Sequence, residues 1–377
     1  MKVVIAPDSF KESMSAAEAA AAIARGVSSV VPGADCVLVP MADGGEGTTN
    51  ALVAALGGAI RKVRTQDALG RPIEAEYGLT DDGLAIIEVA AAVGIEQVAP
   101  EDRDIMHSSS RGVGELVRAA MDAGASRLIV GLGGSVTSDG GAGLLTELGV
   151  KLLDEDGQPV APTPTGLLWV SRLEVAGLDP RLRRLRIDVA CDVTNPLLGP
   201  TGAAAVFGPQ KGATPEQVPV LDAALERLAT CLVVAGMPDV RDQPGAGAAG
   251  GLGAALLALG GRMRRGVEVV AEAAGLAAAI AGADLVLTGE GSIDRQTLSG
   301  KTPAGVAEIA ERQGVPVIAF AGRVGPDTDI LLAHGFAAIV PIMTAPADLA
   351  TALVEGPANL ERAAATALRL HQLPSAP

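Results

Sequence analysis

The sequence has few aromatic side chains, with one Trp, one Tyr and four Phe among 377 residues. Proteins that bind single-stranded nucleic acids combine aromatic stacking with positive charge. Positive charge is also in short supply, since 29 Lys and Arg stand against 44 Asp and Glu and leave a net charge of −15. A surface of that sign repels a phosphate backbone. We therefore expect no nucleic-acid partner.

Cysteine and histidine are scarce too, with three of each. Cys36, Cys191 and Cys231 lie far apart and are odd in number, which supports neither a disulfide framework nor a Cys-x-x-Cys metal site. The dispersed histidines argue against a His-ligated metal.

Long apolar runs are missing, because 48 Gly and 24 Pro interrupt a composition that is 49% hydrophobic. The longest uncharged stretch, residues 245–261, contains seven glycines and is a poor membrane span. Residues 3–6 are too short for the core of a signal peptide. These features predict a cytoplasmic α/β protein without a membrane partner.

The first segments of the chain alternate between strand and helix signals. A β-branched strand over residues 2–6 is followed by a helix to Val30, which opens with a capping box at Ser15 and Glu18. A second strand over 36–40 and a second helix over 48–56 follow. This βαβα order predicts a parallel sheet.

The pattern then changes to short runs that predict an antiparallel meander, at 61–65, 73–79 and 85–89. A helix over 112–123 and strands over 127–130 and 185–190 come next. Regular α/β signals return near Val267, with strands at 284–288, 316–321 and 337–341. We predict a doubly wound, Rossmann-like or flavodoxin-like parallel-sheet domain from residues 1–66 and 266–377, with a mixed α/β domain inserted at 67–265.

Five predicted strands end in loops that combine Asp or Glu with Gly, Ser or Thr: residues 7–13, 41–49, 131–143, 191–196 and 289–294. Any one loop could be a capped turn. Turn chemistry, however, does not require the acids to gather at the carboxyl ends of strands, where α/β sheets bind ligands. Glycine loops bring backbone N–H groups to phosphates, and Mg²⁺ joins phosphates to carboxylates. Phosphoryl transfer is the leading reaction class.

Two short motifs are misleading. Gly300-Lys301-Thr302 resembles the end of a Walker A loop, but Arg295 stands where that motif requires glycine. We expect a helix start instead, with Thr302 as N-cap and Pro303 as the first helical residue. Residues 245–250 spell G-x-G-x-x-G without a preceding strand. An NAD-dependent oxidoreductase rests only on that motif, and a solute-binding protein is disfavoured by the missing signal peptide.

Several of these loops together resemble the bacterial type I glycerate kinases, namely 8–13, 41–47, 131–143, 192–197 and 288–294. The resemblance runs in order from Met1 to about His371. It implies phosphorylation of D-glycerate with ATP and Mg²⁺. It also implies a discontinuous two-domain architecture with the active site in the cleft between the domains.

The resemblance and the loop chemistry together nominate site residues. The catalytic candidates are Asp43, Lys11 and Asp192, with Asp188 as the alternative to Asp192. The candidates for binding glycerate are Asp8, Ser9, Ser109, Ser110, Arg71 and Arg295, with Arg323 a further candidate for its carboxylate. The candidates for binding nucleotide are Gly133, Gly134, Ser135, Asp139, Gly289, Glu290, Gly291 and Lys301. The candidates for Mg²⁺ are Asp192, Glu290 and Asp294.

Some questions stay open at the level of the sequence. Either the 2- or the 3-hydroxyl of glycerate could accept the phosphoryl group, and glycerate analogues could also be substrates. Which acid is the base and which holds Mg²⁺ is also open. The protein could be a monomer or a homodimer.

Overall fold

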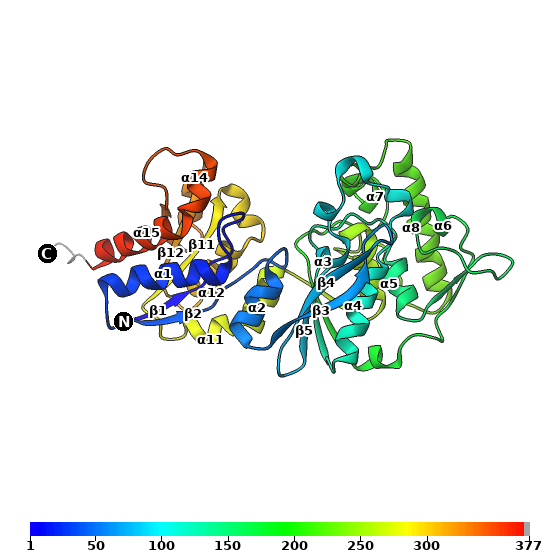
Figure 1. The fold of residues 1–377 in the computed structure, drawn as a ribbon, viewed down its shortest axis with the longest axis horizontal. Coiled ribbons are helices and arrows are strands. Elements are labelled where there is room, and N and C mark those ends of the chain that lie inside the picture. The colour runs from blue at the N-terminus through cyan, green and yellow to red at the C-terminus, as the bar shows by residue number, and fades with distance from the viewer. Residues whose placement is uncertain (373–377) are drawn as a thin grey trace. The chain divides into compact units, whose positions relative to one another are not determined.

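A computed structural model describes residues 1–372, apart from the side chain of Ser299, and the chain divides into two compact units (Figure 1). Unit 1 comprises residues 1–43, 50–57 and the chain from 265 onward, and unit 2 comprises 44–49 and 58–264. Strand β3 (Ala59–Gln66) pairs with β4 (Pro72–Leu79) and lies in unit 2, whereas the boundary expected from the sequence places residues up to 66 in the first domain.

Unit 1 contains a five-stranded parallel sheet in the order β13-β12-β11-β1-β2. Its strands are β1 (Lys2–Ile5), β2 (Asp35–Leu38), β11 (Leu285–Ile293), β12 (Val317–Val324) and β13 (Phe336–Pro341). Counted along the chain, this is the flavodoxin-like order 2-1-3-4-5. The predicted doubly wound sheet made from both ends of the chain is confirmed.

The helices of unit 1 cover both faces of this sheet. They are α1 (Ala16–Val30), α2 (Thr48–Leu56), α10 (Gly266–Ala273), α11 (Leu276–Ile280), α12 (Thr302–Glu311), α13 (Asp329–Leu332), α14 (Leu349–Val354) and α15 (Gly356–His371). The predicted capping box of α1 is present, with Ser15 and Glu18 bonded to each other's backbone.

In β1, the consecutive residues Val3, Val4 and Ile5 point alternately to the two faces of the sheet and are all buried, as a sheet covered on two sides requires. Val3 and Ile5 belong to the core that includes residues of α1 and α15, and the intervening Val4 is equally inaccessible. α1 and α15 lie side by side, in blue and red (Figure 1). The two ends of the chain therefore build one core.

Unit 2 is built on a mixed sheet in the order β10-β9-β6-β5-β4-β3. Its remaining strands are β5 (Leu84–Glu88), β6 (Arg127–Gly131), β9 (Arg186–Ala190) and β10 (Arg262–Arg264), with a separate antiparallel pair β7 (Lys151–Leu153) and β8 (Arg172–Glu174). β3, β4 and β5 are antiparallel neighbours, so the predicted meander is confirmed. The strands β5, β6, β9 and β10 are parallel.

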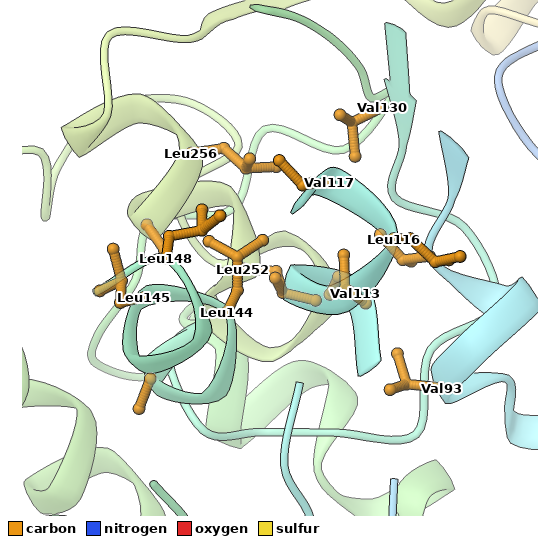
Figure 2. Close-up of a cluster of buried hydrophobic side chains, with 14 of the residues drawn as sticks. Val93, Val113, Leu116, Val117, Val130, Leu144, Leu145, Leu148, Leu252 and Leu256 are labelled. Carbon is orange, nitrogen blue, oxygen red and sulfur yellow. The ribbon is translucent and has the colours of Figure 1, made fainter. Parts of the chain in front are cut away.

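The main core of unit 2 is aliphatic and lies among helices and the sheet. Figure 2 shows Val113 and Leu116 of α4, Leu144 of α5 and Leu252 of α9 in this cluster. The helices of unit 2 are α3 (Ala90–Val93), α4 (Arg111–Asp122), α5 (Ala142–Glu147), α6 (Pro164–Leu167), α7 (Ala203–Phe207), α8 (Gln217–Val234) and α9 (Leu252–Ala258). Short 3-10 turns occur at η1 (Ile95–Gln97), η2 (Pro100–Asp102), η3 (Ile105–His107), η4 (Pro180–Arg184), η5 (Pro209–Lys211), η6 (Ala248–Gly251) and, in unit 1, η7 (Arg295–Ser299).

The glycine-rich stretch 245–250 does not follow a strand. It forms turns that lead through η6 into α9, with Ala249 and Gly250 at positive φ. This geometry lacks the strand-to-helix turn of a dinucleotide site. Within residues 1–372, no helix is both long and apolar enough to cross a bilayer.

Candidate active site

The carboxyl ends of β1 and β11 meet at the point where the strand order of unit 1 reverses. In sheets of this order, ligands bind in the crevice beyond those strand ends. Asp8 and Ser9 follow β1, and Glu290 lies in the last part of β11. The backbone N–H of Asp8 donates to the carbonyl of Gly289 at 2.8 Å, which fixes the β1 loop to β11.

The Asp8 carboxylate is held in place by two donors. The backbone N–H of Ser9 donates to its Oδ1 at 2.6 Å, and the hydroxyl of Thr302 donates to its Oδ2. Burial, followed by the negative charge of Asp43, raises the pKa of Asp8 to about 7, although both hydrogen bonds oppose the rise. Acidic groups are therefore crowded at this crevice.

Glu290 pairs with Lys301 at the same crevice. The Lys301 ammonium lies 3.3 Å from Glu290 Oε2 and donates to the carbonyl of Ser292 at 3.4 Å. The hydroxyl of Thr297 donates to Glu290 Oε1 at 3.0 Å. Burial raises the pKa of Glu290, and the charge of Lys301 opposes that rise. A cation and a carboxylate are thus held together beside Asp8.

The start of α12 differs from the prediction by one residue. Lys301 is the N-cap, so Thr302 is the first helical residue and Pro303 the second. The Thr302 hydroxyl does not cap the helix because it donates to Asp8 instead. The long-range contact with the β1 loop has displaced the local capping interaction, and Lys301 stands at the positive end of the helix dipole.

Part of the predicted 289–294 loop is strand. Gly289 pairs with Phe320 of β12, and a Cβ at Gly289 would lie 2.5 Å from the Phe320 carbonyl oxygen. Glycine is needed there for strand packing, and Gly291 continues the strand. Asp294 is the N-cap of η7 and accepts from the Gln296 backbone at 2.8 Å, as expected if this acid is a turn cap.

The other predicted residues of unit 1 lie around this crevice or at its border. Asp43 follows β2 and is partly buried, and its charge acts on both Asp8 and Glu290. Lys11 is exposed in the turn between Phe10 and Met14. Arg295 and Arg323 are exposed.

In unit 2, the loop after β6 is open at its tip and buried behind it. Gly133 and Gly134 are exposed, and Gly134 has a φ of +70°, which favours glycine. Ser135 is 6% exposed. The tip therefore offers backbone groups rather than side chains, as a phosphate-binding turn requires.

Asp139 is fully buried at the far end of this loop. Its carboxylate accepts from the backbone and hydroxyl of Ser110 and from the backbone of Gly141 and Gly143, at 2.7 to 3.2 Å. Burial raises the pKa of Asp139, and the hydrogen bonds oppose the rise. These contacts join the starts of α4 and α5, so the Asp139–Ser110 pair holds the loop from inside.

The remaining candidates of unit 2 differ in their surroundings. Asp192 is exposed after β9, at the same sheet edge as Gly133. Asp188 is buried in β9, where Arg186 donates to its Oδ2 at 3.0 Å. The Ser109 hydroxyl is buried and has no hydrogen-bond partner among the described residues. Arg71 pairs with the buried Asp67 within one turn, at 2.5 Å.

Two residues with marked surroundings were missed from the sequence. Glu88 ends β5, and its carboxylate accepts from the backbone of Gly47 at 3.2 Å and of Thr49 at 2.7 Å. It thereby ties the 44–49 loop to β5 within unit 2. An acid at the end of the run Leu84–Glu88 is a visible signal of the kind found in the other loops. Lys211 is buried behind Ser135, and nothing in its sequence neighbourhood marks it.

The residues of unit 1 fit a magnesium ion that arrives with a nucleotide. In the described part of the chain, no three His, Cys, Asp or Glu side chains gather as a metal site. Mg²⁺ bound with ATP needs only one or two carboxylates, because phosphates and water supply the other ligands. Asp43 and Glu290 could provide such carboxylates. Burial is the main cause of the raised pKa of Asp8, and the repulsion from Asp43 that adds to it is the kind a cation relieves.

The fold and these loops define a two-unit α/β protein with ligand-binding chemistry at the carboxyl edges of its parallel strands. The family model described as "Glycerate kinase family" matches residues 3–372. The chain belongs to the glycerate kinase family.

Named relatives cover almost all of the chain. Glycerate kinase of Bacillus subtilis (strain 168) is 48% identical over 97% of this chain and 96% of the relative. Glycerate 2-kinase of Escherichia coli (strain K12) is 47% identical over 91% of each chain. The crystal structure of a Salmonella typhimurium LT2 protein assigned as glycerate kinase 2 superposes with a TM-score of 0.91, at 48% identity and over 99% of both chains.

Proposed function

We propose that this protein transfers the γ-phosphoryl group of ATP to the 2-hydroxyl of D-glycerate. Family membership and the similarity to an E. coli relative named glycerate 2-kinase support the acceptor and the position. The observation that carries the proposal within the fold is the group of Asp8, Glu290 and Lys301 at the β1/β11 crevice. Cation, carboxylates and glycine backbone are the parts that phosphoryl transfer uses.

Each unit offers its own candidate donors for nucleotide phosphates. In unit 1, these are Lys301 and the N-terminus of α12, which adds about half a positive charge. In unit 2, the exposed backbone of Gly133 and Gly134 offers neutral donors. Asp43 and Glu290 would hold Mg²⁺, which supplies neutralisation of the phosphate charge when bound.

We assign the proton-accepting role to a carboxylate at a strand end. Asp192 stands at such an end and can accept the proton of the attacking hydroxyl, and Asp43 is the alternative base if Glu290 holds Mg²⁺ without it. Asp188 is a poorer candidate because Arg186 already engages it inside the strand. Lys11, Ser9, Ser109 and the arginines Arg295 and Arg323 remain candidates for the glycerate carboxylate.

Three nominated residues are better explained as supports. Asp139 and Ser110 use their polar atoms on each other and on the loop backbone, and Arg71 neutralises the buried Asp67. We propose that they shape the loops without touching substrate.

The test is ADP release coupled to an optical assay, with D-glycerate present and absent, followed by phosphorus NMR of the product. We expect glycerate-dependent ADP and a spectrum of 2-phosphoglycerate. No glycerate-dependent ADP would remove the proposed activity. A spectrum of 3-phosphoglycerate would keep the kinase and correct the position.

A further inference from the structure

A buried lysine lies behind the glycine turn of unit 2. Lys211 is 2% exposed and ends the 3-10 turn η5. Its ammonium donates to the Ser135 hydroxyl at 3.1 Å and to the Thr137 carbonyl at 2.7 Å. Both acceptors lie within four residues of Gly133, so the lysine holds the segment that directly continues the exposed tip.

The glycine turn is held on its other side by backbone contacts. The Gly134 carbonyl accepts from the backbone of Ile95 at 2.7 Å, and the Val136 backbone donates to the Val93 carbonyl at 2.9 Å. The segment after Gly134 is thus fixed by residues 93–95 and by Lys211. Gly133 and Gly134 themselves remain exposed.

The lysine is itself anchored by its own loop. Arg103 donates to the Gln210 carbonyl at 3.0 Å, and Gly212 follows with a φ of +96°. This turn directs Lys211 inward rather than into solvent. The backbone of this turn therefore sets the inward direction of the Lys211 side chain.

Burying an ammonium group costs free energy unless acceptors and a counter-charge compensate it. The two acceptors and the nearby Asp139 compensate in part, while burial lowers the pKa of Lys211 to about 7. The hydroxyls of Thr137 and Ser138 are buried without a partner among the described residues. An apolar side chain would fill this buried position without the cost of burying a charge. Stability alone therefore does not explain the lysine, and its hydrogen bonds to the loop do.

We propose that Lys211 is a positioning residue for ATP, which fixes the Gly133–Gly134 turn by holding Ser135 and Thr137 from behind. This inference rests on the proposed function, because it takes the turn to be a phosphate-binding element. Without the ammonium, the turn would sample several conformations, and the phosphates would have to order it on binding.

The test compares three variants with the wild-type enzyme. Lys211→Met removes the ammonium and keeps an unbranched chain, and Ser135→Ala removes one of the two acceptors. Leu221→Ala is the matched control, because Leu221 is a buried residue of α8 in a core cluster of the same unit. Calorimetry measures the Kd of a non-hydrolysable ATP analogue with Mg²⁺, and steady-state assays measure the KM values of ATP and glycerate.

We expect Lys211→Met to raise the analogue Kd and the ATP KM tenfold or more, with the glycerate KM within twofold of wild type. Ser135→Ala should raise them less, by about threefold. Leu221→Ala should lower the melting temperature and leave the Kd unchanged. If Lys211→Met does not fold, Ser135→Ala decides the matter.

An unchanged Kd in folded Lys211→Met, or an equal rise in Leu221→Ala, would overturn the inference. If Lys211→Met is unfolded, an unchanged Kd in Ser135→Ala overturns it as well. Failure of the proposed function looks different, since the wild-type enzyme would bind the analogue but release no glycerate-dependent ADP. A wild-type enzyme that binds no nucleotide would overturn both.

Discussion

Asp43 and Asp192 occupy equivalent places, each shortly after a parallel strand in its own unit. Asp43 is partly buried and its charge acts on Asp8 and Glu290, while Asp192 is exposed at the strand edge of unit 2. Asp139 and Asp294 have a different use, since their carboxylates accept backbone N–H groups of their own loops. A carboxylate that accepts hydrogen bonds in a turn stabilises the fold, whereas a carboxylate that faces a reacting group increases the rate of the reaction.

We expect Asp43→Asn and Asp192→Asn each to reduce kcat/KM by roughly a hundredfold or more, with melting temperatures close to wild type, because the role we propose for both carboxylates is to act on the transition state. Steady-state kinetics and thermal denaturation measure both effects. Asp156→Asn, in an exposed turn, is the control and should keep full activity. Near-wild-type turnover in both variants would show that these acids only shape turns.

Ionisation of Asp8 makes the stability of the folded protein depend on pH. Its pKa is about 7 in the folded protein and 3.8 as the ordinary value, so the folded state holds the proton more tightly than the unfolded chain. The contribution of Asp8 to stability therefore decreases as the pH rises from about 4 to about 7 and is constant above that range. The cause is burial of a carboxylate near Asp43.

Asp8→Asn removes this ionisation, and its amide can still pair with Ser9 and Thr302. We expect the variant to gain stability over wild type at pH 8, on the order of 2–4 kcal/mol, and to lose this advantage below pH 4. Urea unfolding in metal-free buffer at both pH values measures it. A stability difference that is the same at pH 4 and pH 8 would contradict the assigned pKa.

At the scale of single elements, two side chains at the start of α12 are paired with residues outside the helix. Lys301 pairs with Glu290, and Thr302 pairs with Asp8 at the other end of the chain. If phosphates bind at this helix end, Lys301 supplies a full charge beside the helix dipole. If they do not, Lys301 only neutralises Glu290.

Lys301→Ala separates these two roles. We expect the KM of ATP to rise at least tenfold and the KM of glycerate to change less than twofold, because only ATP carries the phosphates that Lys301 would contact. Lys151→Ala, an exposed lysine paired with Glu174, should leave both values unchanged. Unchanged kinetics with a stability loss below about 1 kcal/mol would mean that the pair with Glu290 is its whole role.

The elements with strong local signals could be predicted from the sequence. The Ser15–Glu18 capping box, the antiparallel meander and the parallel strands of unit 1 depend on residues close in the chain, and the structure confirms them. The sequence predicts that β11 stops at Thr288, but the strand continues to Ile293. The segment 289–293 has the composition of a loop, yet Gly289, Glu290 and Ser292 pair with β12, and tertiary pairing decides their conformation.

The site could be predicted less well for the same reason. The acids at strand ends were visible because strand ends are local features. The engagement of Thr302 by Asp8, the burial of Lys211 and the role of Asp139 arise from contacts between residues far apart in the chain. No window of the sequence contains both partners.

At the scale of the whole molecule, the acidic crevice of unit 1 is the feature that bears on a metal requirement. Unit 1 has the carboxylates Asp8, Asp43 and Glu290 near one another, and unit 2 has an uncharged glycine turn. Three acids at one site are unfavourable for a tetra-anionic nucleotide unless a cation accompanies it. The carboxylates of unit 1 therefore support the magnesium requirement that we propose.

We expect excess EDTA to abolish activity fully and added Mg²⁺ to restore it, with no requirement for zinc. The coupled assay with Mg²⁺, Zn²⁺ or no metal after chelation measures this. The matching variant Glu290→Gln should raise the Mg²⁺ concentration needed for half-maximal activity severalfold. Activity that survives thorough chelation would contradict the metal assignment.

The two ends of the chain meet in unit 1 through α1 and α15, and Gly26 lies where the two helices approach closely. A Cβ at Gly26 would lie 2.3 Å from the Glu361 carbonyl oxygen and 2.8 Å from the Ala364 Cβ. The first of these is a backbone atom, so relief requires a shift of a whole helix. Both helices pack on the same sheet through the core of unit 1, and a shift of α15 would open that core.

We expect Gly26→Val to destabilise unit 1 by about 1–3 kcal/mol, the usual cost of overpacking, since valine has little advantage over glycine in helix propensity. Gly33→Val is the control, because a Cβ added at Gly33 would have no atom within 4 Å and the backbone there does not require a positive φ. Urea unfolding of both variants measures the difference. If the two substitutions cost the same, the close approach of α1 and α15 does not hold the ends of the chain together. A large loss at Gly26 alone would show that the sheet that carries Asp8 and Glu290 depends on the last helix of the chain.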